Sequence, residues 1–592
     1  MAVSEFLAYV RGATSRILNE HDDAFAFCSA MTTNSTRFET AARALSLLPE
    51  SRDVRDYAIS TAYALLIGSE RRKRLSAYFT PPALADAAVH AAAALISDCD
   101  NLRTLDPACG GGSFLGPMLR FLVARERDGG WSTDEACRRV LTGLRGIEID
   151  PDLARLSGLL LRERLREEYG YVQPERDATI VQGDSLHIKL DGVFDVVVGN
   201  PPYGKVGRGV DPATLARAGL AGIGGHTNVY GLFLLRALDW LKPGGGLVFI
   251  LPTSFVAGPY FSGLRQEVLS RAEVLSIDLH EQRENLFVGA VQDVCLLVLR
   301  RRAAGLRTVG SEEQYELGFI DAAGRRQSLG SACATSGGEP WTLPVPGMVS
   351  RSSPRPKKDG QLYTLLDYGY RLRVGKVVPT RERDRLADRR VKGSLPLVWA
   401  SDVRPDGTFQ FKGTQRKRAS AWYVPAFSDV AYATRAPCVL VQRTSNRDQR
   451  RRLNAASVST DFLRQHAKRG FVAENHVIVV EAATARPAVS PEALAAVLNA
   501  ASTNERFSAV SGSFSISAKL LARLALPAPA RLPNTDRSNF ADELRTVFET
   551  VPDLLAPSKP AGDTENTLDQ AGNLSGGTAV DEDAGFKRRA VA

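Results

Sequence analysis

Short apolar runs separated by helical patterns indicate the architecture of this chain. Residues 193–199 contain Val196, Val197 and Val198 in succession, which is typical of a parallel strand buried on both faces rather than of an alternating strand. Further short apolar runs lie at 104–105, 146–149, 178–181, 247–252, 274–279 and 294–299. Helical patterns such as 83–96 and 228–241 lie among them, so the sequence predicts an α/β fold with a mostly parallel sheet.

The composition changes outside this region. Residues 1–70 have a helical pattern, with Phe6, Leu7, Val10 and Leu18 on one face, and we interpret them as a helical brace for the α/β domain expected at 71–330. Residues 331–360 are rich in Ser, Gly and Pro and predict a linker. Residues 361–535 combine short β-like runs with basic clusters and predict a second, α+β domain, whereas 556–592 are expected to be disordered.

Length and composition exclude several classes of protein. A chain of 592 residues with 44% hydrophobic residues is expected to form several globular domains. No apolar run reaches the ~18 residues of a membrane span, and the first residues lack the pattern of a signal peptide, so we expect a cytoplasmic protein. The 7 cysteines form no CxxC pair and the 7 histidines show no ligand spacing, so neither disulfides nor a metal site is predicted.

The charge is concentrated in one part of the chain. The net charge is +9, but residues 351–480 hold 27 Lys and Arg against 11 Asp and Glu, a surplus of 16 that leaves the remainder at −7. A solvated basic surface is the simplest explanation of such a run. Its restriction to one predicted domain favours a docking surface for a polyanion such as DNA.

The strand at 193–199 is followed by Asn200, Pro201, Pro202 and Tyr203. The prolines end the strand, which leaves the Asn200 side chain and the Pro201 carbonyl as acceptors at its carboxyl end, where open α/β sheets bind ligands. Two acceptors for the hydrogens of an exocyclic base amine would favour a pyramidal, nucleophilic nitrogen, and Tyr203 offers a ring on which an extruded base can stack. Taken alone, the segment could equally be a Pro-Pro turn.

A glycine turn follows an earlier strand. Asp106, Pro107, Ala108 and Cys109 precede Gly110, Gly111 and Gly112, so the backbone can approach a ligand closely and the following helix presents free N–H groups. The pattern is neither GxGxxG nor GxxxxGK[ST], which argues against a dinucleotide or a nucleoside triphosphate. Asp106 would repel phosphate and attract an ammonium group.

Two more carboxylates follow successive strands. Glu148 lies at the tip of the second predicted strand, where it can accept both hydroxyls of a ribose, and Asp184 follows the third, where it can accept from an adenine amine. Each alone is more commonly a loop residue or a helix cap. Their order, with Asn200 after the fourth strand, is the stronger signal.

With these motifs the chain resembles the DNA adenine-N6 methyltransferases of restriction–modification systems, in the class where the cofactor motif precedes the catalytic motif and the recognition region comes last. The resemblance covers about 70–530. It implies a class I methyltransferase domain, Rossmann-like with a mostly parallel seven-stranded sheet, and S-adenosylmethionine as cofactor. The implied cofactor residues are Thr80, Asp106, Pro107, Ala108, Gly110, Gly112, Glu148, Asp184 and Phe233, and the catalytic residues are Asn200, Pro201, Pro202 and Tyr203.

Two expectations concern the surroundings of the catalytic segment. Residues 204–225 hold seven glycines and predict a loop that closes over DNA, although an idle surface insertion is the alternative. The family places a second aromatic near the last hairpin, where this sequence has Arg300, Arg301 and Arg302; Phe287 is the nearest candidate.

The basic region contains the predicted DNA contacts. Lys and Arg would pair with phosphates, while a smaller set would read base edges. The segments 441–444 and 474–476 also resemble recognition regions of the family. The predicted DNA-binding residues are Arg416, Lys417, Arg418, Arg443, Arg450, Arg451 and Asn475.

The sequence thus predicts a monomeric enzyme that methylates N6 of a flipped adenine in duplex DNA and protects host DNA from a separate, cognate restriction endonuclease. The alternatives are methylation of an exocyclic amine in RNA, methylation of a protein glutamine amide, or a DNA-binding protein without activity. Enzymes of the glutamine type are compact and lack a basic domain like 351–480. Cys109 is not placed as a cytosine-C5 nucleophile would be.

Overall fold

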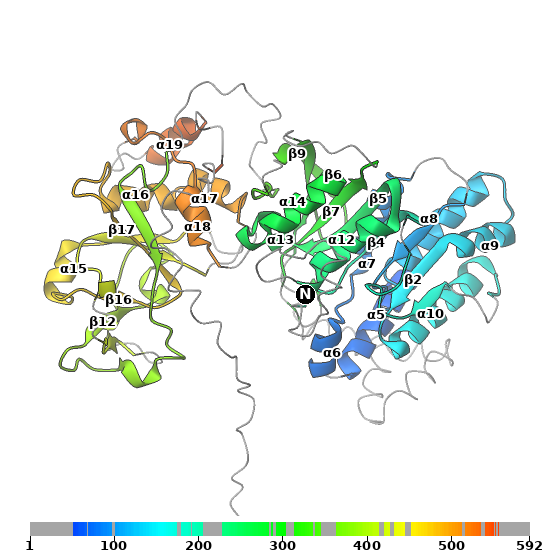
Figure 1. Cartoon of the computed structure of the whole chain (residues 1–592), viewed down its shortest axis with the longest axis horizontal. Coiled ribbons are helices and arrows are strands. Elements are labelled where there is room, and N and C mark those ends of the chain that lie inside the picture. Colours follow the sequence, from blue (N-terminus) through cyan, green and yellow to red (C-terminus); the bar gives the residue numbers. More distant parts are fainter. Residues whose placement is uncertain are drawn as a thin grey trace, which may run out of the picture. The chain divides into compact units, whose positions relative to one another are not determined.

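The computed structural model describes most of the chain between residues 51 and 555. The described ranges are 51–67, 69–96, 101–173, 179–190, 192–204, 228–282, 286–287, 290, 292–303, 313–334, 338–344, 363–413, 420–426, 431–444, 451–511, 515–533, 539–549, 551 and 554–555. The chain divides into two compact units. The first comprises Met1–Lys357 and Ser508–Ser513, and the second comprises Lys358–Phe507 and Phe514–Ala592. Each is described by itself (Figure 1).

The first unit is built on one mixed sheet in the order β3-β2-β1-β4-β5-β7-β6-β8-β9. Strand β7 runs antiparallel to both neighbours, and β9 runs antiparallel to β8, while the other pairs are parallel. The strands are β1 Thr104–Asp106, β2 Leu144–Glu148, β3 Ile180–Gln182, β4 Phe194–Gly199, β5 Leu241–Pro252, β6 Ala272–His280, β7 Val294–Arg301, β8 Glu313–Ile320 and β9 Arg326–Ala334. The first seven strands correspond to the expected sheet, and β8 and β9 extend it.

Strand β4 is buried on both faces, as the run of valines predicts. Val197 packs into the core beneath α12, whereas Val196 and Val198 pack into the core beneath α7 and α8. Because helices cover both faces of the sheet, every side chain of this strand's valine run is removed from water. The helices of this unit are α7 Pro82–Ala93, α8 Leu115–Asp128, α9 Thr133–Gly143, α10 Pro151–Tyr169, α12 Val229–Trp240, α13 Thr253–Ala257, the 3-10 turn Pro259–Phe261 and α14 Ser262–Arg271.

Helices α5 (Arg52–Leu66) and α6 (Ser69–Leu75) precede the sheet. Residues of α5, including Ile59 and Tyr63, are buried against Leu156 and Leu160 of α10. The described part of the expected N-terminal helical segment therefore packs on α10 of the sheet domain, and residues 1–50 lie outside the described part of the chain.

The predicted linker begins too early. Residues 331–334 belong to β9, and beyond it Trp341 and Leu343 are buried in the core of the first unit. The buried Arg265 guanidinium donates to the carbonyls of Gly338 and Glu339, which holds this segment against α13. Strand β9 lies at the edge of the sheet, where only Ala334 is fully buried, so it consists mostly of small and polar residues whose composition is that of a linker.

The second unit contains two four-stranded sheets, in the orders β10-β17-β14-β15 and β11-β13-β12-β16, with helices packed beside them. The strands are β10 Tyr370–Val374, β11 Leu386–Ala387, β12 Leu395–Val398, β13 Trp422–Tyr423, β14 Cys438–Gln442, β15 Ala455–Val458, β16 Val472–Ala473 and β17 Val477–Ala482. The helices are α15 Thr460–Gln465, α16 Pro491–Asn499, α17 Ala501–Ser508, α18 Ala518–Arg523 and α19 Phe540–Phe548, with 3-10 turns at Arg383–Arg385, Ala400–Asp402 and Pro529–Arg531. The α+β prediction agrees with this arrangement.

The expected end of this domain at 535 is too early. Leu544 and Phe548 of α19 are buried in the same core as Leu521 and Phe507, so the domain extends to at least Val551. A short amphipathic helix after an irregular segment gives only a weak signal in sequence, because its stability comes from packing. Residues 556–592 lie outside the described ranges.

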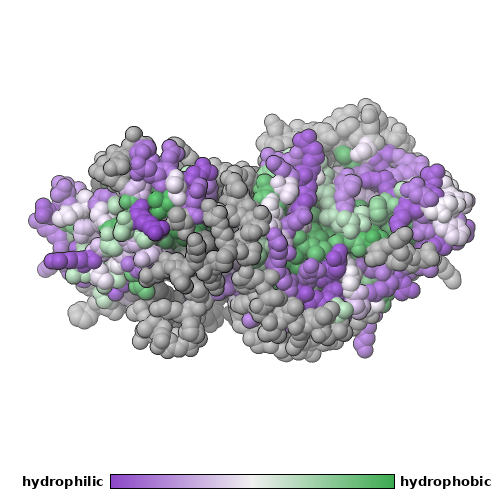
Figure 2. All heavy atoms as spheres, turned by 90° about the horizontal axis from the view of Figure 1, so that it is seen from above, coloured by the Kyte–Doolittle hydropathy of each residue, from purple (hydrophilic) through white to green (hydrophobic). Residues whose placement is uncertain are grey.

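Among the described residues, no helix combines the length and the apolar character that crossing a membrane requires. Figure 2 shows hydrophilic residues over much of the described surface and an apolar area within the face of the first unit, surrounded by hydrophilic residues.

Candidate active site

The carboxyl ends of β1, β2 and β4 meet at one edge of the sheet, because these strands are parallel and in register. Asp106 ends β1, Glu148 ends β2, and Asn200 follows β4. The backbone N–H of Gly110 donates to Glu148 Oε2 at 3.0 Å, and the Ser185 hydroxyl donates to the Pro107 carbonyl. The structure therefore brings the glycine turn, Glu148 and the loop of Asp184 together.

The glycine turn has no room for side chains. Gly110 has φ +53 and Gly112 has φ +83, in the left-handed region that favours glycine. A Cβ at Gly110 would lie 2.8 Å from the Phe79 ring, and one at Gly111 would lie 1.8 Å from the Ser60 hydroxyl oxygen. The turn is therefore held closely by α5 and by the segment before α7, as well as by the sheet.

Asp106 is a buried carboxylate with one unused oxygen. Its Oδ1 accepts from the Ala108 N–H at 3.1 Å, while its buried Oδ2 has no hydrogen-bond partner among the described residues. Burial raises the pKa of Asp106 to about 8, with the Glu148 charge adding to the effect and the Ala108 N–H opposing it. An unsatisfied buried carboxylate is costly, so the site fits a cationic ligand such as the ammonium group of S-adenosylmethionine.

Glu148 is fixed through its neighbours. Its Oε1 accepts from the Asp150 N–H at 2.9 Å, and burial raises the pKa of its carboxyl above the ordinary value. Asp150 in turn accepts from the Tyr63 hydroxyl at 2.8 Å and from Arg71 at 2.7 Å. Although burial opposes it, the Arg71 contact lowers the pKa of Asp150, which stays ionised. Residues of α5 and α6 thus hold Asp150, and the backbone N–H of Asp150 in turn fixes Glu148, the carboxylate expected at the ribose.

Asp184 and Phe233 have partners within the protein. Asp184 Oδ1 accepts from the Leu186 N–H at 3.0 Å, and Oδ2 lies 2.9 Å from His187 Nδ1. A carboxylate oxygen can accept a further bond, so the predicted adenine contact stays a prediction. Phe233 is buried in the core beside Trp240, with ring centroids 6.5 Å apart. This position favours a packing role for Phe233 over contact with a cofactor.

Residues 200–203 hold one buried side-chain acceptor that is still available. Asn200 Nδ2 donates to the Thr80 hydroxyl oxygen at 3.1 Å, whereas Asn200 Oδ1 is buried without a hydrogen-bond partner among the described residues. The Tyr203 hydroxyl donates to the Ile250 carbonyl at 3.1 Å, which fixes its ring after the two prolines. Of the glycine-rich loop expected at 204–225, only Gly204 lies within the described ranges.

Phe287 lies beside Tyr203. The two ring centroids are 6.3 Å apart with an interplanar angle of 82°, and the centroid of the Tyr230 ring lies 6.2 Å from that of Tyr203.

Arg301 and Arg302 lie at the other end of the sheet, where Arg301 donates to the Leu241 carbonyl and Arg302 pairs with Glu313. The reason is that β7 is antiparallel, so its beginning rather than its end is on the side of Asn200.

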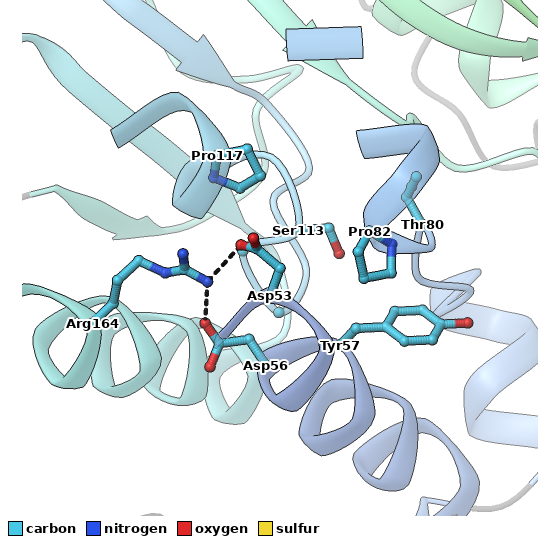
Figure 3. Close-up of a pocket in the computed structure, with 10 residues that line it drawn as sticks. Asp53, Asp56, Tyr57, Thr80, Pro82, Ser113, Pro117 and Arg164 are labelled. Carbon is cyan, nitrogen blue, oxygen red and sulfur yellow. Dashed lines mark hydrogen bonds and ion pairs between the residues drawn. The ribbon is translucent and has the colours of Figure 1, made fainter. Parts of the chain in front are cut away.

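Sequence reasoning missed the ion-pair network between α5 and α10. The buried Arg164 guanidinium lies 2.8 Å from Asp53 and 2.7 Å from Asp56, beside a pocket that also borders the glycine turn (Figure 3). The pocket is lined by Asp53, Asp56, Tyr57, Thr80, Pro82, Gly111, Gly112, Ser113, Pro117 and Arg164. The available signal was the pair of acidic residues three apart on α5, which faces inward instead of into solvent.

Replacing Arg164 by methionine should destabilise the first unit by about 3 kcal/mol, because Asp53 and Asp56 would each lose the more deeply buried of their two arginine partners and keep only Arg120 and Arg52. Denaturant unfolding measures the loss. Arg166→Met on the same helix is the matched control, since Arg166 is exposed and pairs with Glu163, and it should change stability by less than about 1 kcal/mol. Equal effects of the two substitutions would contradict the role of the network.

In the second unit, the structure brings the two predicted recognition segments together. The Arg443 N–H donates to the His476 carbonyl at 2.7 Å, and Arg443 Nη1 donates to the Asn475 carbonyl at 3.1 Å. The buried Arg443 Nε has no partner among the described residues. Arg451 donates to the Pro405 carbonyl, and Arg416, Lys417, Arg418 and Arg450 lie outside the described ranges.

The strand order, with β7 inserted antiparallel between β5 and β6, is that of the class I S-adenosylmethionine-dependent methyltransferases. Residues 152–287, which include Asn200 and Tyr203, match the Eco57I restriction-modification methylase model. The cofactor of the fold class is S-adenosylmethionine.

Comparisons with individual proteins agree. The chain is 24% identical over 286 residues to the Type II methyltransferase M.PstI of Providencia stuartii, covering 45% of this chain and 52% of that protein. It is 27% identical over 264 residues to the Type II methyltransferase M.PaeR7I of Pseudomonas aeruginosa, covering 41% and 44%. The chain therefore spans about half the length of these relatives. The fold is similar to that of the Type IIL restriction-modification enzyme MmeI, solved in complex with DNA, with TM-score 0.52, 12% identity and coverage of 94% of this chain and 91% of the other.

Proposed function

We propose that this protein is an S-adenosylmethionine-dependent DNA methyltransferase that acts on N6 of an adenine flipped out of the duplex. The observation that carries the proposal is the unpartnered, buried Oδ1 of Asn200, at the same sheet edge as the unpartnered Oδ2 of Asp106. One oxygen is suited to an amine that reacts and the other to an ammonium that anchors the cofactor.

The residues present fit the cofactor. Asp106 would pair with its ammonium group, Glu148 with its ribose hydroxyls, and Asp184 with its adenine amine. S-adenosylmethionine supplies a methyl group on a sulfonium, which is already activated for transfer. The protein therefore needs to position and to orient the acceptor rather than to form a covalent intermediate.

Asn200 and Tyr203 prepare the acceptor. Asn200 Oδ1 and the Pro201 carbonyl accept the hydrogens of the base amine, which localises the nitrogen lone pair for attack. Tyr203, with Phe287 beside it, provides an aromatic wall for the extruded base. Cys109 is buried and its pKa lies well above the ordinary value because of that burial, so its thiol stays neutral and a cytosine-C5 nucleophile is not supported.

DNA is favoured over protein and RNA as the substrate by two observations. The surplus of basic residues between 351 and 480 suits a polyanion, and most of this region belongs to the second compact unit, where Arg443 donates to the Asn475 carbonyl. The names of the relatives, Type II methyltransferases, and the DNA complex of MmeI agree with DNA. We further propose that a separate endonuclease cuts the same DNA sequence and that methylation protects the host DNA from this cleavage.

Transfer of a labelled methyl group from S-adenosylmethionine to duplex DNA, structured RNA and protein tests the proposal. We expect label in duplex DNA, and N6-methyladenine as the modified nucleoside after digestion and chromatography. Label only in RNA or protein, or N4-methylcytosine as the product, would contradict it. Long-read sequencing of host DNA from cells that express the chain identifies the methylated sequence, and resistance of that DNA to an endonuclease of the same specificity tests protection.

Arg443→Met should weaken binding to duplex DNA by about tenfold and reduce its salt dependence, because the guanidinium sits between the two recognition segments. Fluorescence anisotropy at several salt concentrations measures both. The matched control is Arg464→Met, an exposed arginine of α15, which should change DNA affinity by less than about twofold. If both variants lose affinity equally, the charge acts generally and Arg443 has no special position.

A further inference from the structure

Thr80 contacts Asn200, the proposed catalytic asparagine. The residue lies directly before Pro81, the N-cap of α7, and Pro82 begins the helix (Figure 3). A residue before proline is restricted to extended conformations, so the backbone of Thr80 has little freedom. Thr80 is 2% exposed, and its hydroxyl oxygen accepts from Asn200 Nδ2 at 3.1 Å, across 120 residues of sequence.

The side-chain amide of Asn200 is planar, so a bond to its nitrogen also fixes its oxygen. With Nδ2 held by Thr80, Oδ1 is the only acceptor of the side chain, and it remains without a partner among the described residues although it is buried. A buried acceptor without a partner costs about 1–3 kcal/mol. Such an arrangement persists when other contacts determine it, and it is a feature of sites that await a ligand.

The support behind Thr80 is rigid. Phe79, the preceding residue, is buried against the glycine turn, where its ring would lie 2.8 Å from a Cβ at Gly110. The Ala77 N–H donates to the Arg72 carbonyl at 3.0 Å, which ties the segment to the end of α6. Thr80 also lines the pocket beside Gly111 and Ser113. Thr80 therefore lies beside the glycine turn, and its hydroxyl accepts from Asn200.

We propose that Thr80 is a positioning residue for Asn200: its hydroxyl oxygen holds Nδ2 so that Oδ1 is directed to the acceptor amine. This inference rests on the proposed function and assigns Thr80 a role that differs from anchoring the cofactor. A cofactor ligand and a positioning residue differ in what their removal changes. Loss of a ligand weakens cofactor binding, whereas loss of the positioning contact lowers kcat while cofactor binding is kept.

The test compares Thr80→Val, which has the shape of threonine without the hydroxyl, with Thr80→Ser, which keeps the hydroxyl. Thr80→Val should lower kcat for DNA methylation by about 10-fold to 100-fold, because a small misplacement of a reacting group has effects of this size. The Kd of S-adenosylmethionine, measured by calorimetry without DNA, should change by less than about threefold. Thr80→Ser should restore kcat to within about threefold of wild type. A raised Kd with unchanged kcat, or failure of serine to restore kcat, would overturn the proposal.

A double-mutant cycle and a structure complete the test. In an Asn200→Ala background, Thr80→Val should have no further effect on kcat, because the two residues act as one unit; additive losses would overturn the proposal. A crystal structure of Thr80→Val should show the Asn200 amide turned away from its wild-type orientation. This readout does not depend on activity. If the wild-type chain fails to methylate DNA, the proposed function fails. The role of Thr80 is still tested, because an Asn200 amide with unchanged orientation in Thr80→Val would overturn it and a turned amide would support it.

Discussion

Replacement of Asn200 by alanine should lower kcat for DNA methylation by at least about 1000-fold, while the Kd values for duplex DNA and for S-adenosylmethionine stay within about threefold of wild type. The reason is that Asn200 Oδ1 is a buried side-chain acceptor that is still available after the proline-ended strand, and its contacts form when the base amine reacts. Single-turnover methyl transfer with saturating DNA measures the loss, and titrations with each ligand measure the affinities.

Pro202→Ala is a useful companion to that variant. It leaves the Asn200 side chain and the Pro201 carbonyl in place, so it should keep far more activity than Asn200→Ala. A variant of Asn200 that methylates DNA at a rate near wild type would remove the basis of the proposed mechanism. Loss of DNA or cofactor binding in Asn200→Ala would instead indicate that the segment supports the fold.

The second large effect is expected at Asp106. Because burial raises its pKa to about 8, the carboxyl of the free protein is largely neutral at pH 6, whereas pairing with an ammonium requires the ionised form. The affinity for S-adenosylmethionine should therefore rise about tenfold between pH 6 and pH 7, and binding should release a proton. Calorimetry in buffers of different ionisation enthalpy counts that proton.

Asp106→Asn is the control, since it keeps the shape of the side chain and removes its titration. Its affinity should be weaker than wild type at pH 7.5 by at least about tenfold, and it should not vary between pH 6 and pH 7. A wild-type affinity that is flat over this range, with no proton released, would contradict the pairing.

The same raised pKa has a consequence for stability without cofactor. The folded protein binds a proton at Asp106 more tightly than the unfolded chain does, so this contribution is fully present below the unfolded pKa near 4 and is lost as pH rises through about 8. Asp106→Asn should therefore gain stability relative to wild type by up to about 1.4 kcal/mol per pH unit across that window. Denaturant unfolding of both proteins at pH 5 and pH 8 measures the difference.

Local patterns were sufficient to predict most of the sheet and the residues at its edge. The valines of β4 predicted burial on both faces, which the two cores confirm. The glycines at 110–112 predicted a close approach of the backbone to a ligand, which stays a prediction, while the structure packs the turn against Phe79 and Ser60. Phe287 was the nearest candidate for a second aromatic, and it lies against Tyr203. By contrast, the start of the linker at 331 and the domain end at 535 were wrong, because β9 and α19 are stabilised by packing that their composition does not reveal. Residues 345–360 of the predicted linker lie outside the described ranges.

The sequence by itself determined the class of fold, the order of strand ends that places Asp106, Glu148 and Asn200 at one edge, and the chemistry those side chains offer, because period, turn residues and residue type are local properties. Only the tertiary structure decided which oxygens remain free. Thr80 reaches Asn200, Arg71 and Tyr63 reach Asp150, and Arg164 reaches Asp53 across long stretches of chain. A hydrogen bond depends on the distance between atoms in space, and residue spacing along a chain does not specify that distance.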